Sequence, residues 1–500
     1  MDENMLPVNI NKSIPQQAYH AETVRDNELT IAARLGLMSM QLMQFAGDSA
    51  FNLLRQRYPK AKTILVLCGS GNNAGDGLIL ARLARAANFH VYVHSVVNPD
   101  KLNGDAKRAC QQFIEQGGQF HKFNDIDVSR IDVIVDGLLG TGLTGKVREN
   151  YRYVIELINQ LNAPILSLDV PSGLNANTGM PMGCAVHADA TVTFVALKHG
   201  LLTGQAADYC GQVFLAGLGI QDEFAKLCND DVGIIANDNV PFLRRRCRSS
   251  HKGDSGRVLL VGGNQSTMGA ISLAGQASLR CGAGLVSIAC HPQYRGFLLA
   301  SCPEMMLVTD FEEQLTEQLK SADSIVLGPG LGLDEWAQQL FVKTLNTDKP
   351  MIVDGDGLTL LAQSQHSRDN WILTPHPKEA ARLLNISVAQ VMADRFEAVK
   401  SIALQYGGIC ILKGAGTLIS DGVQVAINTS GNPGMASGGM GDLLTGILAA
   451  LRLQSATDFE ACCTGVFFHG KAADLACEDG EKGMLASDLL PILRQLVNRT

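Results

Sequence analysis

The chain repeats one local pattern, in which a short apolar run is followed by a polar or glycine-rich loop and then by a helical stretch. The runs show no alternation of apolar and polar residues, so both faces of each strand are predicted to be buried. Strands of this type separated by helices predict parallel sheets covered on both faces, which is an α/β fold. In the first half, after a helical stretch at 19–58, the predicted strands span 63–67, 90–97, 133–136, 164–169, 190–196 and 212–216.

The same pattern begins again after a more polar segment near 218–250. A length of 500 residues exceeds what one hydrophobic core usually serves, so more than one domain is expected. We place the boundary in the polar segment, interpret its basic residues 244–246 as solvated surface, and predict domains at 1–225 and 240–500. In the second half, the predicted strands span 258–261, 286–289, 324–327, 351–353, 371–374 and 410–412, with helices at 270–281 and 391–406 and a last long helix from near Gly441.

Composition disfavours several classes of protein. The formal net charge of −8 argues against binding to nucleic acids or to anionic membrane surfaces. The 13 cysteines contain no Cys-x-x-Cys pair and no zinc spacing, so reduced thiols in a cytoplasmic protein are expected. Residues 1–28 hold no apolar signal core, and the longest apolar stretch, 443–453, is too short to span a membrane. We expect small-molecule partners, and also association into a homo-oligomer.

The first glycine-rich loop, 68–77, reads Cys-Gly-Ser-Gly-Asn-Asn-Ala-Gly-Asp-Gly and precedes a helix predicted from Leu78. Glycines allow the backbone to approach a phosphate, and a helix N-terminus supplies free N–H donors. Asn72, Asn73 and Asp76 add side-chain oxygens, which suit a cation or the hydroxyl groups of a ligand. A tight strand-to-helix turn without a ligand is the structural alternative.

Two further polar loops follow predicted strand ends in the same half. The loop 136–146 begins at Asp136 and reads Asp-Gly-Leu-Leu-Gly-Thr-Gly-Leu-Thr-Gly-Lys, and the loop 168–174 contains Asp169 and Ser172. The carboxyl ends of parallel strands lie at one edge of a sheet, where α/β proteins bind ligands. The three loops are therefore predicted to converge on one ligand site, and three plain turns are the alternative.

Together these loops resemble the epimerase domain of the NAD(P)H-hydrate repair enzymes, over about 20–220. The resemblance implies a Rossmann-like three-layer domain with a potassium ion held by Asn73, Asp136 and Ser172, and Asp169 is our candidate proton carrier. Ala74 stands where the family loop commonly has glycine, and we expect little effect unless this position needs a positive φ. The residues implied to bind the hydrated dinucleotide are Asn72, Asn73, Ala74, Gly75, Asp76, Gly140, Thr141, Gly142, Leu143, Thr144, Gly145, Lys146, Tyr151 and Asp169.

A long glycine-rich motif of the second half, 429–446, contains Gly438-Gly-Met-Gly-Asp442 ahead of an apolar stretch. Backbone N–H groups of such a segment can form an anion hole for a phosphoryl group in transfer. An aspartate at the start of the helix is a candidate base for a hydroxyl nucleophile. Asp442 is therefore predicted to be catalytic, and an ordinary helix N-cap is the alternative.

Other loops at predicted strand ends support this second site. Residues 412–417, Leu-Lys-Gly-Ala-Gly-Thr, are interpreted as a contact to nucleotide phosphates. His376 could orient a substrate or cap the following helix, and Glu379 could hold magnesium through water. The loops 328–332 and 354–358 lie at two further strand ends.

These motifs resemble the dehydratase domain of the same family, which has a ribokinase-like α/β fold, over about 245–495. The run Gly-Asn-Pro-Gly-Met-Ala at 431–436 is its most specific part, and the helix that contains His469 is interpreted as structural. The resemblance implies that the hydrated dinucleotide is bound by Ala270, Gly332, His376 and Asp442, and the adenine nucleotide by Lys413, Gly414, Ala415, Gly416, Thr417 and Gly441.

The presence of both halves in one chain implies a bifunctional enzyme that repairs NADH and NADPH hydrated at C6 of the nicotinamide ring. The N-terminal domain would interconvert the R and S hydrates, and the C-terminal domain would dehydrate the S hydrate with ADP (or ATP) and Mg²⁺. Phosphorylation makes the hydroxyl a good leaving group, which explains a kinase fold in a lyase. The alternative is a small-molecule kinase of the vitamin-precursor type with a non-catalytic N-terminal ligand-binding or scaffolding module.

Overall fold

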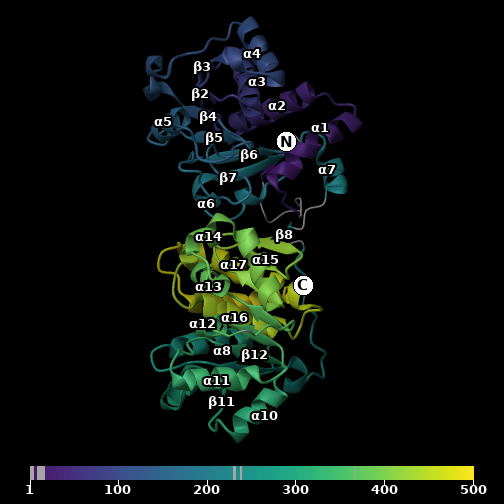
Figure 1. Cartoon of the computed structure of the whole chain (residues 1–500), viewed down its shortest axis with the longest axis vertical. Helices are drawn as coiled ribbons and strands as arrows, with labels where there is room; N and C mark the ends of the chain where they lie inside the picture. Colours follow the sequence, from purple (N-terminus) through teal and green to yellow (C-terminus); the bar gives the residue numbers. More distant parts are fainter. Residues whose placement is uncertain are drawn as a thin grey trace. The chain divides into compact units, whose positions relative to one another are not determined.

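The chain forms two compact units, Met1–Val232 and Gly233–Thr500 (Figure 1). The computed structural model describes residues 5–7, 17–228, 232–236, 239–241, 243–364 and 366–499. Each unit contains one sheet of mainly parallel strands with helices against it, which confirms the predicted α/β class. The assignment of separate functions to 1–225 and 240–500 remains a prediction.

The first unit is organised around a seven-stranded sheet of described residues. Its strands are β1 (Met5–Pro7), β2 (Thr63–Cys68), β3 (His90–Ser95), β4 (Val133–Gly137), β5 (Ile165–Leu168), β6 (Ala190–Phe194) and β7 (Gln212–Ala216). Their order in the sheet is β1-β7-β6-β5-β4-β2-β3, and only β1 runs antiparallel to its neighbour. The sequence did not predict β1, because three residues in a polar stretch carry no periodic pattern.

Helices cover both faces of this sheet (Figure 1). They are α1 (Ala21–Arg34), α2 (Ser39–Arg57), α3 (Asn72–Ala86), α4 (Gly104–Glu115), α5 (Glu149–Ile158), α6 (Ala206–Tyr209) and α7 (Gln221–Leu227). Successive side chains of a strand point to opposite faces, so β2 serves two cores. Ile64 and Val66 pack with α2, α3 and α4, whereas Leu65 and Leu67 pack with α5. The unit is a three-layer domain, as predicted.

Helix α3 begins at Asn72 rather than at Leu78, so Asn72–Gly77 lie within its first turns, whereas Gly69 and Gly71 precede it. Gly75 permits close packing there, because a Cβ on it would lie 2.6 Å from the sulfur of Met43. Ala74 is fully buried in the same helix and does not have a positive φ, so the alanine fits. Gly75 therefore serves close helix packing and not a loop, and the predicted start of the helix was wrong.

The second unit is organised around a ten-stranded sheet of described residues. Its strands are β8 (Val232–Ile235), β9 (Arg257–Val261), β10 (Leu285–Ala289), β11 (Met306–Leu307), β12 (Ser324–Leu327), β13 (Met351–Val353), β14 (Trp371–Leu373), β15 (Ile409–Leu412), β16 (Thr417–Ser420) and β17 (Val425–Asn428). Their order is β11-β10-β9-β12-β13-β14-β15-β16-β17-β8. The strands from β11 to β15 are parallel, and β15, β16 and β17 form an antiparallel meander.

The antiparallel part of this sheet was not predicted. The segment 413–417 is the turn between β15 and β16, so it joins two adjacent strands instead of leading into a helix. β8 lies inside the polar segment near 218–250, which was predicted to lie between domains. Both differences arise because short strands at the end of a sheet take their identity from their neighbours.

The helices of the second unit surround this sheet. They are α8 (Met268–Arg280), α9 (Arg295–Ser301), α10 (Glu313–Ser321), α11 (Glu335–Leu345), α12 (Asp356–Leu361), α13 (Pro377–Leu384), α14 (Val388–Ala393), α15 (Arg395–Tyr406), α16 (Met440–Leu451), α17 (Asp458–Ala476) and α18 (Leu489–Leu496). Two predicted helices are each interrupted. The stretch 19–58 is broken where Gly36 has φ 77°, and 391–406 is broken at Asp394, which caps α15. The predicted helix near Gly441 is α16, but it is not the last long helix, because α17 follows it and is longer.

Helix α16 lies at the centre of the second core (Figure 1). It is apolar on all sides, and such a helix is expected to be buried. It contacts both α8 and α17. The approach to α8 needs Gly446, because a Cβ there would lie 2.0 Å from the carbonyl oxygen of Ala274. Close packing on both sides fixes the N-terminus of α16, which carries Asp442 in its first turn.

All 13 cysteines of the chain are free thiols. In the part of the chain that the structure describes, no helix combines the length and the apolar character needed to cross a bilayer.

Candidate active sites

Three loops meet at the carboxyl edge of the first sheet, where β2, β4 and β5 are neighbours. Asn73, in the first turn of α3, donates from Nδ2 to the carbonyl oxygens of Leu139 at 3.2 Å and Leu168 at 3.1 Å. The backbone N–H of Leu139 in turn donates to Ser172 Oγ over 2.8 Å. One hydrogen-bond network therefore joins the three loops, which lie together as the sequence analysis expected.

Asp136 is a fully buried carboxyl within this network. Its Oδ1 accepts from Ser172 Oγ at 2.5 Å and from Leu138 N at 3.2 Å. Its Oδ2 accepts from Ser167 Oγ and Ser172 N, both at 2.8 Å. Burial raises the pKa of Asp136, and the hydrogen bonds from Ser172 and Ser167 oppose this rise. Asp136 thus holds Ser172 in one orientation beside Asn73.

The side-chain oxygen of Asn73 is buried and finds no hydrogen-bond partner among the described residues. Its orientation is fixed, because the amide nitrogen of the same side chain is held by two carbonyl oxygens. A buried acceptor without a partner costs roughly 1–3 kcal/mol. Ser172 Oγ lies 3.0 Å from the carbonyl oxygen of Leu139, which also accepts from the Asn73 amide nitrogen. Neutral oxygens of this kind are ligands that hard cations take. No cluster of three or more His, Cys, Asp or Glu with metal-binding geometry occurs among the described residues.

The other predicted ligand residues of this unit lie around the same sheet edge. Residues 140–146 form a largely exposed loop between β4 and α5, and Tyr151 on α5 is buried. Asp169 directs Oδ2 toward this loop, since a Cβ on Gly140 would lie 3.4 Å from it. Burial, helped by the charges of Asp169 and a glutamate on α1, raises the pKa of Asp76 well above its usual range.

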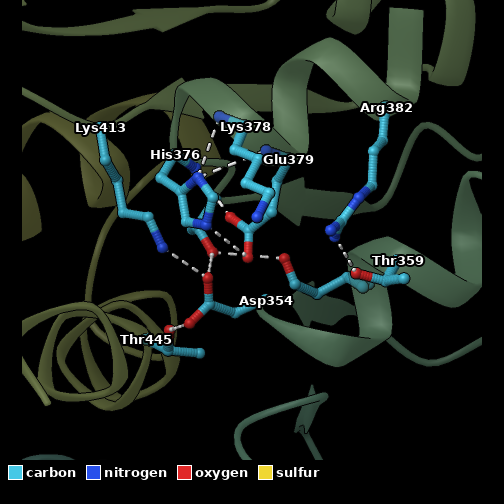
Figure 2. Close-up of polar contacts among 10 residues, drawn as sticks. Asp354, Thr359, His376, Lys378, Glu379, Arg382, Lys413 and Thr445 are labelled. Atoms are coloured by element: carbon cyan, nitrogen blue, oxygen red, sulfur yellow. Dashed lines mark hydrogen bonds and ion pairs between the residues drawn. The ribbon is translucent and has the colours of Figure 1, made fainter. Parts of the chain in front are cut away.

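A buried ion pair forms the centre of the second site (Figure 2). Asp354 follows β13 and Lys413 follows β15, and Lys413 Nζ donates to Asp354 Oδ1 over 2.7 Å. Thr374 donates to the same Oδ1 at 2.7 Å, and Thr445 on α16 donates to Oδ2 at 3.0 Å. Burial would raise the pKa of Asp354, but the charge of Lys413 and these hydrogen bonds hold it below its usual value. The pair therefore keeps one negative and one positive charge at fixed positions.

Asp442 lies in the first turn of α16, close enough to this pair for their charges to act on it. The N-cap of α16 is Gly439, with φ 93°, and no described side chain caps the helix. The alternative interpretation of Asp442 as an N-cap was therefore wrong. Burial and the charge of Asp354 raise the pKa of Asp442 to about 7, against the attraction of Lys413. A carboxyl that titrates near neutral pH beside free helix N–H groups has the properties of a general base at an anion site.

Gly441 lies directly over the ion pair. A Cβ on it would be 3.0 Å from Lys413 Nζ and 3.9 Å from Asp354 Oδ2. The absence of a side chain leaves the ammonium group of Lys413 open toward the start of α16. A positive charge and the N-terminus of a helix are therefore brought together at one point, an arrangement that favours phosphate groups.

His376 caps α13, which was the structural alternative for this residue. Its Nδ1 accepts from the N–H groups of Lys378 at 3.0 Å and Glu379 at 3.3 Å, and the Glu379 carboxylate accepts from His376 N at 2.8 Å (Figure 2). Burial raises the pKa of Glu379 to about 7, and burial together with the charge of Lys413 lowers the pKa of His376. The His376 side chain is still 46% exposed, so capping leaves it available to a ligand.

The turn 413–417 is held by Arg395, a buried residue of α15. The Arg395 guanidinium donates from Nη2 to the carbonyl oxygens of Leu412 at 3.2 Å, Lys413 at 3.4 Å and Gly416 at 3.2 Å. Burial lowers the pKa of Arg395 to about 10. Three backbone carbonyls bound to one guanidinium fix the shape of the turn.

The two remaining predicted residues lie at loops of the same unit. Gly332 has φ 79°, and its N–H donates to Asp356 Oδ2 at 2.8 Å. Ala270 lies in the first turn of α8, where its N–H donates to the carbonyl oxygen of Thr267 at 3.2 Å. Thr267 Oγ1 donates to Gly330 O at 2.9 Å, so the loop with Gly332 is attached to the start of α8.

Known proteins match the chain over nearly its full length. Residues 258–495 match the family described as NAD(P)H-hydrate dehydratase, and residues 39–200 match the family described as YjeF-related protein N-terminus. The bifunctional NAD(P)H-hydrate repair enzyme Nnr of Escherichia coli K12 is 43% identical, over 97% of this chain and 95% of its own. The enzyme of the same name from Coxiella burnetii is 43% identical, over 96% of this chain and 99% of its own. The chain belongs to the family of bifunctional NAD(P)H-hydrate repair enzymes.

The fold of this repair enzyme agrees with its family. A ribokinase-like superfamily protein of Enterococcus faecalis is similar in structure, with a TM-score of 0.50 and 32% identity over 54% of this chain and 97% of that chain. This similarity confirms the predicted ribokinase-like fold of the second unit. Matches that span both units favour a bifunctional repair enzyme over a kinase with a non-catalytic N-terminal module.

Several residues of the two sites were missed by reasoning from the sequence. Asp354 lies in a loop that the sequence analysis singled out for its position, but the ion pair with Lys413 was not foreseen. Thr445, Arg395 and Lys198 carry no motif of their own. Their roles follow only from contacts in the folded chain. Thr445 contacts Asp354, Arg395 contacts the turn 413–417, and Lys198 contacts Asp169.

Proposed function

We propose that this repair enzyme interconverts the R and S hydrates of NADH and NADPH in its first unit and dehydrates the S hydrate with ADP in its second. The main support for this proposal is the position and the pKa of Asp442. Its carboxyl, with a pKa of about 7, lies at the uncapped start of α16 beside Lys413. A base, an amide-lined anion site and a lysine together suit phosphoryl transfer to a hydroxyl group.

Dehydration proceeds in two stages in this proposal. Asp442 takes the proton of the C6 hydroxyl while the hydroxyl oxygen bonds to the terminal phosphorus of ADP, and the bond from that phosphorus to its bridging oxygen breaks to release AMP. The C6–O bond then breaks with the help of the lone pair on the ring nitrogen, and phosphate leaves. Loss of a proton from C5 to solvent water restores the ring double bond. The N–H groups of 438–441 stabilise the phosphoryl charge.

The ligand contacts of the second unit are proposed as follows. His376 orients the hydrate, and Glu379 holds Mg²⁺ through water, since carboxylate oxygens suit this ion. The magnesium ion supplies neutralising charge on the nucleotide phosphates. The hydrate is bound by Ala270, Gly332, His376 and Asp442, and the adenine nucleotide by Lys413, Gly414, Ala415, Gly416, Thr417 and Gly441.

The direct test of the proposed function is a time course with a mixture of both hydrates, ADP and Mg²⁺. NADH should reappear in two phases, seen as recovery of its near-ultraviolet absorbance. The fast phase reports dehydration of the S hydrate, and the slow phase reports conversion of R to S. Absence of any recovery contradicts the proposal, and a stable phosphorylated product favours the kinase alternative.

Dehydration should depend on the protonation state of Asp442. The base must be ionised, and burial raises its pKa to about 7, so kcat/KM for the S hydrate should fall as pH drops below about 7. Each pH unit below this value should lower the rate about tenfold, and the rate should level off above it. The measurement is the rate of the fast phase across pH. A profile that stays flat down to the acid range contradicts Asp442 as the base.

The first unit is proposed to bind potassium between Asn73 and Ser172, with Asp136 supplying the negative charge. The unpartnered oxygen of Asn73 supports this proposal, because a cation would offset the cost of burying it. Asp169 is the proposed proton carrier. The hydrate would lie against Asn72–Asp76, Gly140–Lys146, Tyr151 and Asp169.

We also propose that the enzyme is a homo-oligomer in the cytoplasm. Light scattering tests its association.

Epimerisation should require potassium. Replacing K⁺ by choline at equal ionic strength should slow the slow phase about tenfold, the equivalent of roughly 1.4 kcal/mol, and leave the fast phase unchanged. Ser172→Ala should raise the K⁺ concentration needed for half-maximal epimerisation. Ser129→Ala, at an exposed serine that hydrogen-bonds to Asp127, is the control. Equal K⁺ requirements of wild type and Ser172→Ala would argue against this site.

A further inference from the structure

Lys198, which follows β6, is a buried lysine that neither predicted site includes. Its side chain is 2% exposed. Its ammonium group donates to Asp169 Oδ1 at 2.6 Å, Thr193 Oγ1 at 2.9 Å and Phe194 O at 2.8 Å. A lysine ammonium has three N–H donors, so these three contacts use all of them. Lys198 is therefore held in one orientation against Asp169 and has no donor left for a ligand.

The two carboxylate oxygens of Asp169 face different partners. Oδ1 faces Lys198 and lies 3.4 Å from Thr193 Oγ1, whereas Oδ2 faces Gly140 in the exposed loop 140–146. The backbone of Asp169 has φ 63°, which non-glycine residues rarely adopt, and its N–H donates to Val192 O at 2.7 Å. A strained backbone of this kind persists only where surrounding contacts hold it, and it occurs often at functional sites.

Three carboxyl groups from different elements lie close enough to this buried ammonium group to interact with its charge. Glu28 comes from α1, Asp76 from α3 and Asp169 from the end of β5, and Arg25 on α1 is a further cation near Glu28. Burial raises the pKa of Glu28 to about 7 and that of Asp76 well above its usual range, and the charge of Lys198 opposes both shifts. Among these three carboxyls, Asp169 is the one that forms a direct ion pair with Lys198, at 2.6 Å.

We propose that Lys198 is the positioning residue of the epimerase: it binds Oδ1 of Asp169 and thereby presents Oδ2 to the C6 hydroxyl of the hydrate beside Gly140. This inference rests on the proposed epimerase function of the first unit. A hydroxyl and a ring nitrogen on the same carbon form a hemiaminal, which can open and close.

A single proton, carried by Asp169, balances the epimerisation. Asp169 Oδ2 takes the proton of the C6 hydroxyl, the C6–N1 bond breaks, and its electron pair goes to N1, which receives the proton from Asp169. The open chain carries an aldehyde at C6. After rotation of this aldehyde, N1 attacks its other face and returns the proton through Asp169 to the new hydroxyl. No further reactant is needed, and Asp169 ends ionised as it began.

Lys198→Met tests the inference in the full-length chain, because methionine keeps most of the length and removes the charge. The two-phase time course with ADP and Mg²⁺ should show a slow phase reduced about a hundredfold and an unchanged fast phase, since loss of alignment at a reacting group has effects of this size. The loss should fall on kcat of epimerisation and leave KM for the hydrate near its wild-type value, because Lys198 aligns Asp169 and has no donor left for the ligand. A lysine that only supported the fold would change KM as well as kcat.

Two variants keep this test decisive. Lys226→Met removes an exposed lysine of the same unit that lies 3.6 Å from Glu223, and it should behave as wild type. Thr193→Val removes one acceptor of Lys198 and should slow epimerisation in the same direction by a smaller factor, which serves if Lys198→Met does not fold. Wild-type rates in Lys198→Met, or a slower rate that comes from a raised KM with kcat unchanged, overturn the inference. Failure of the wild type to equilibrate purified R and S hydrates would instead overturn the proposed epimerase function.

Discussion

Asp442→Asn should lower the rate of dehydration at least about a hundredfold and leave epimerisation at the wild-type rate, because proton transfer by a positioned carboxyl contributes on this scale. Asparagine keeps the shape of the side chain and cannot accept the hydroxyl proton. In the two-phase time course, the fast phase should disappear. Chromatographic separation of the hydrates should still show R and S reaching equilibrium, since that reaction belongs to the other unit in our proposal.

The stability of Asp442→Asn separates loss of chemistry from loss of fold. The folded-state pKa of Asp442 is raised to about 7, so the folded protein binds this proton more tightly than the unfolded chain does. Its ionisation therefore destabilises the fold as pH rises from the usual aspartate range toward 7. At neutral pH the amide should leave the melting temperature unchanged or higher. Glu313→Gln, at an exposed acidic residue in the first turn of α10, is the control. A lowered melting temperature together with loss of both activities would contradict a catalytic role.

Lys413→Met should remove both dehydration and a large part of the stability of the second unit. In the wild type, the side chain of Lys413 is 20% exposed and that of Asp354 is 4% exposed. Methionine at position 413 leaves the Asp354 carboxylate buried without its cation. Breaking a buried pair from one side costs roughly 3–5 kcal/mol in the free energy of unfolding. Loss of the positive charge at the phosphate site should lower the dehydration rate about a hundredfold. Denaturant unfolding of the second unit and the fast phase are the two measurements.

The double variant Lys413→Met with Asp354→Asn distinguishes the two effects. Removing both charges should restore most of the lost stability, because no charge is then left buried alone, but it should not restore dehydration. Lys343→Met is the matched control, since Lys343 forms an ion pair with Glu312 at 3.2 Å and Glu312 is 90% exposed. Such a surface pair should contribute at most about 1 kcal/mol. Recovery of dehydration in the double variant would show that Lys413 acts only through Asp354.

The α/β class and the family were predicted correctly from the sequence, which also indicated the loops of the two candidate sites. The reason is that each rests on a local signal. Apolar runs between helices predict parallel strands, and 438–442 carries its glycines and its aspartate within five consecutive positions. Signals of this kind fail where one residue type serves two purposes. The glycines of 72–77 were predicted to form a loop, whereas the structure uses them for close packing within α3.

The tertiary structure alone decided which charges meet. Asp354 and Lys413 are 59 positions apart, and Lys198 and Asp169 are 29 apart. They touch because β13 and β15 flank β14 in one sheet, and because β5 and β6 are neighbours in the other. The order of strands in a sheet results from the packing of the whole unit, so no single segment of the sequence predicts it. The sequence by itself therefore determined that Asp442 and Asp169 stand at strand and helix ends suited to chemistry. The fold determined which lysine stands beside each of them, and with it the charge that each carboxyl experiences.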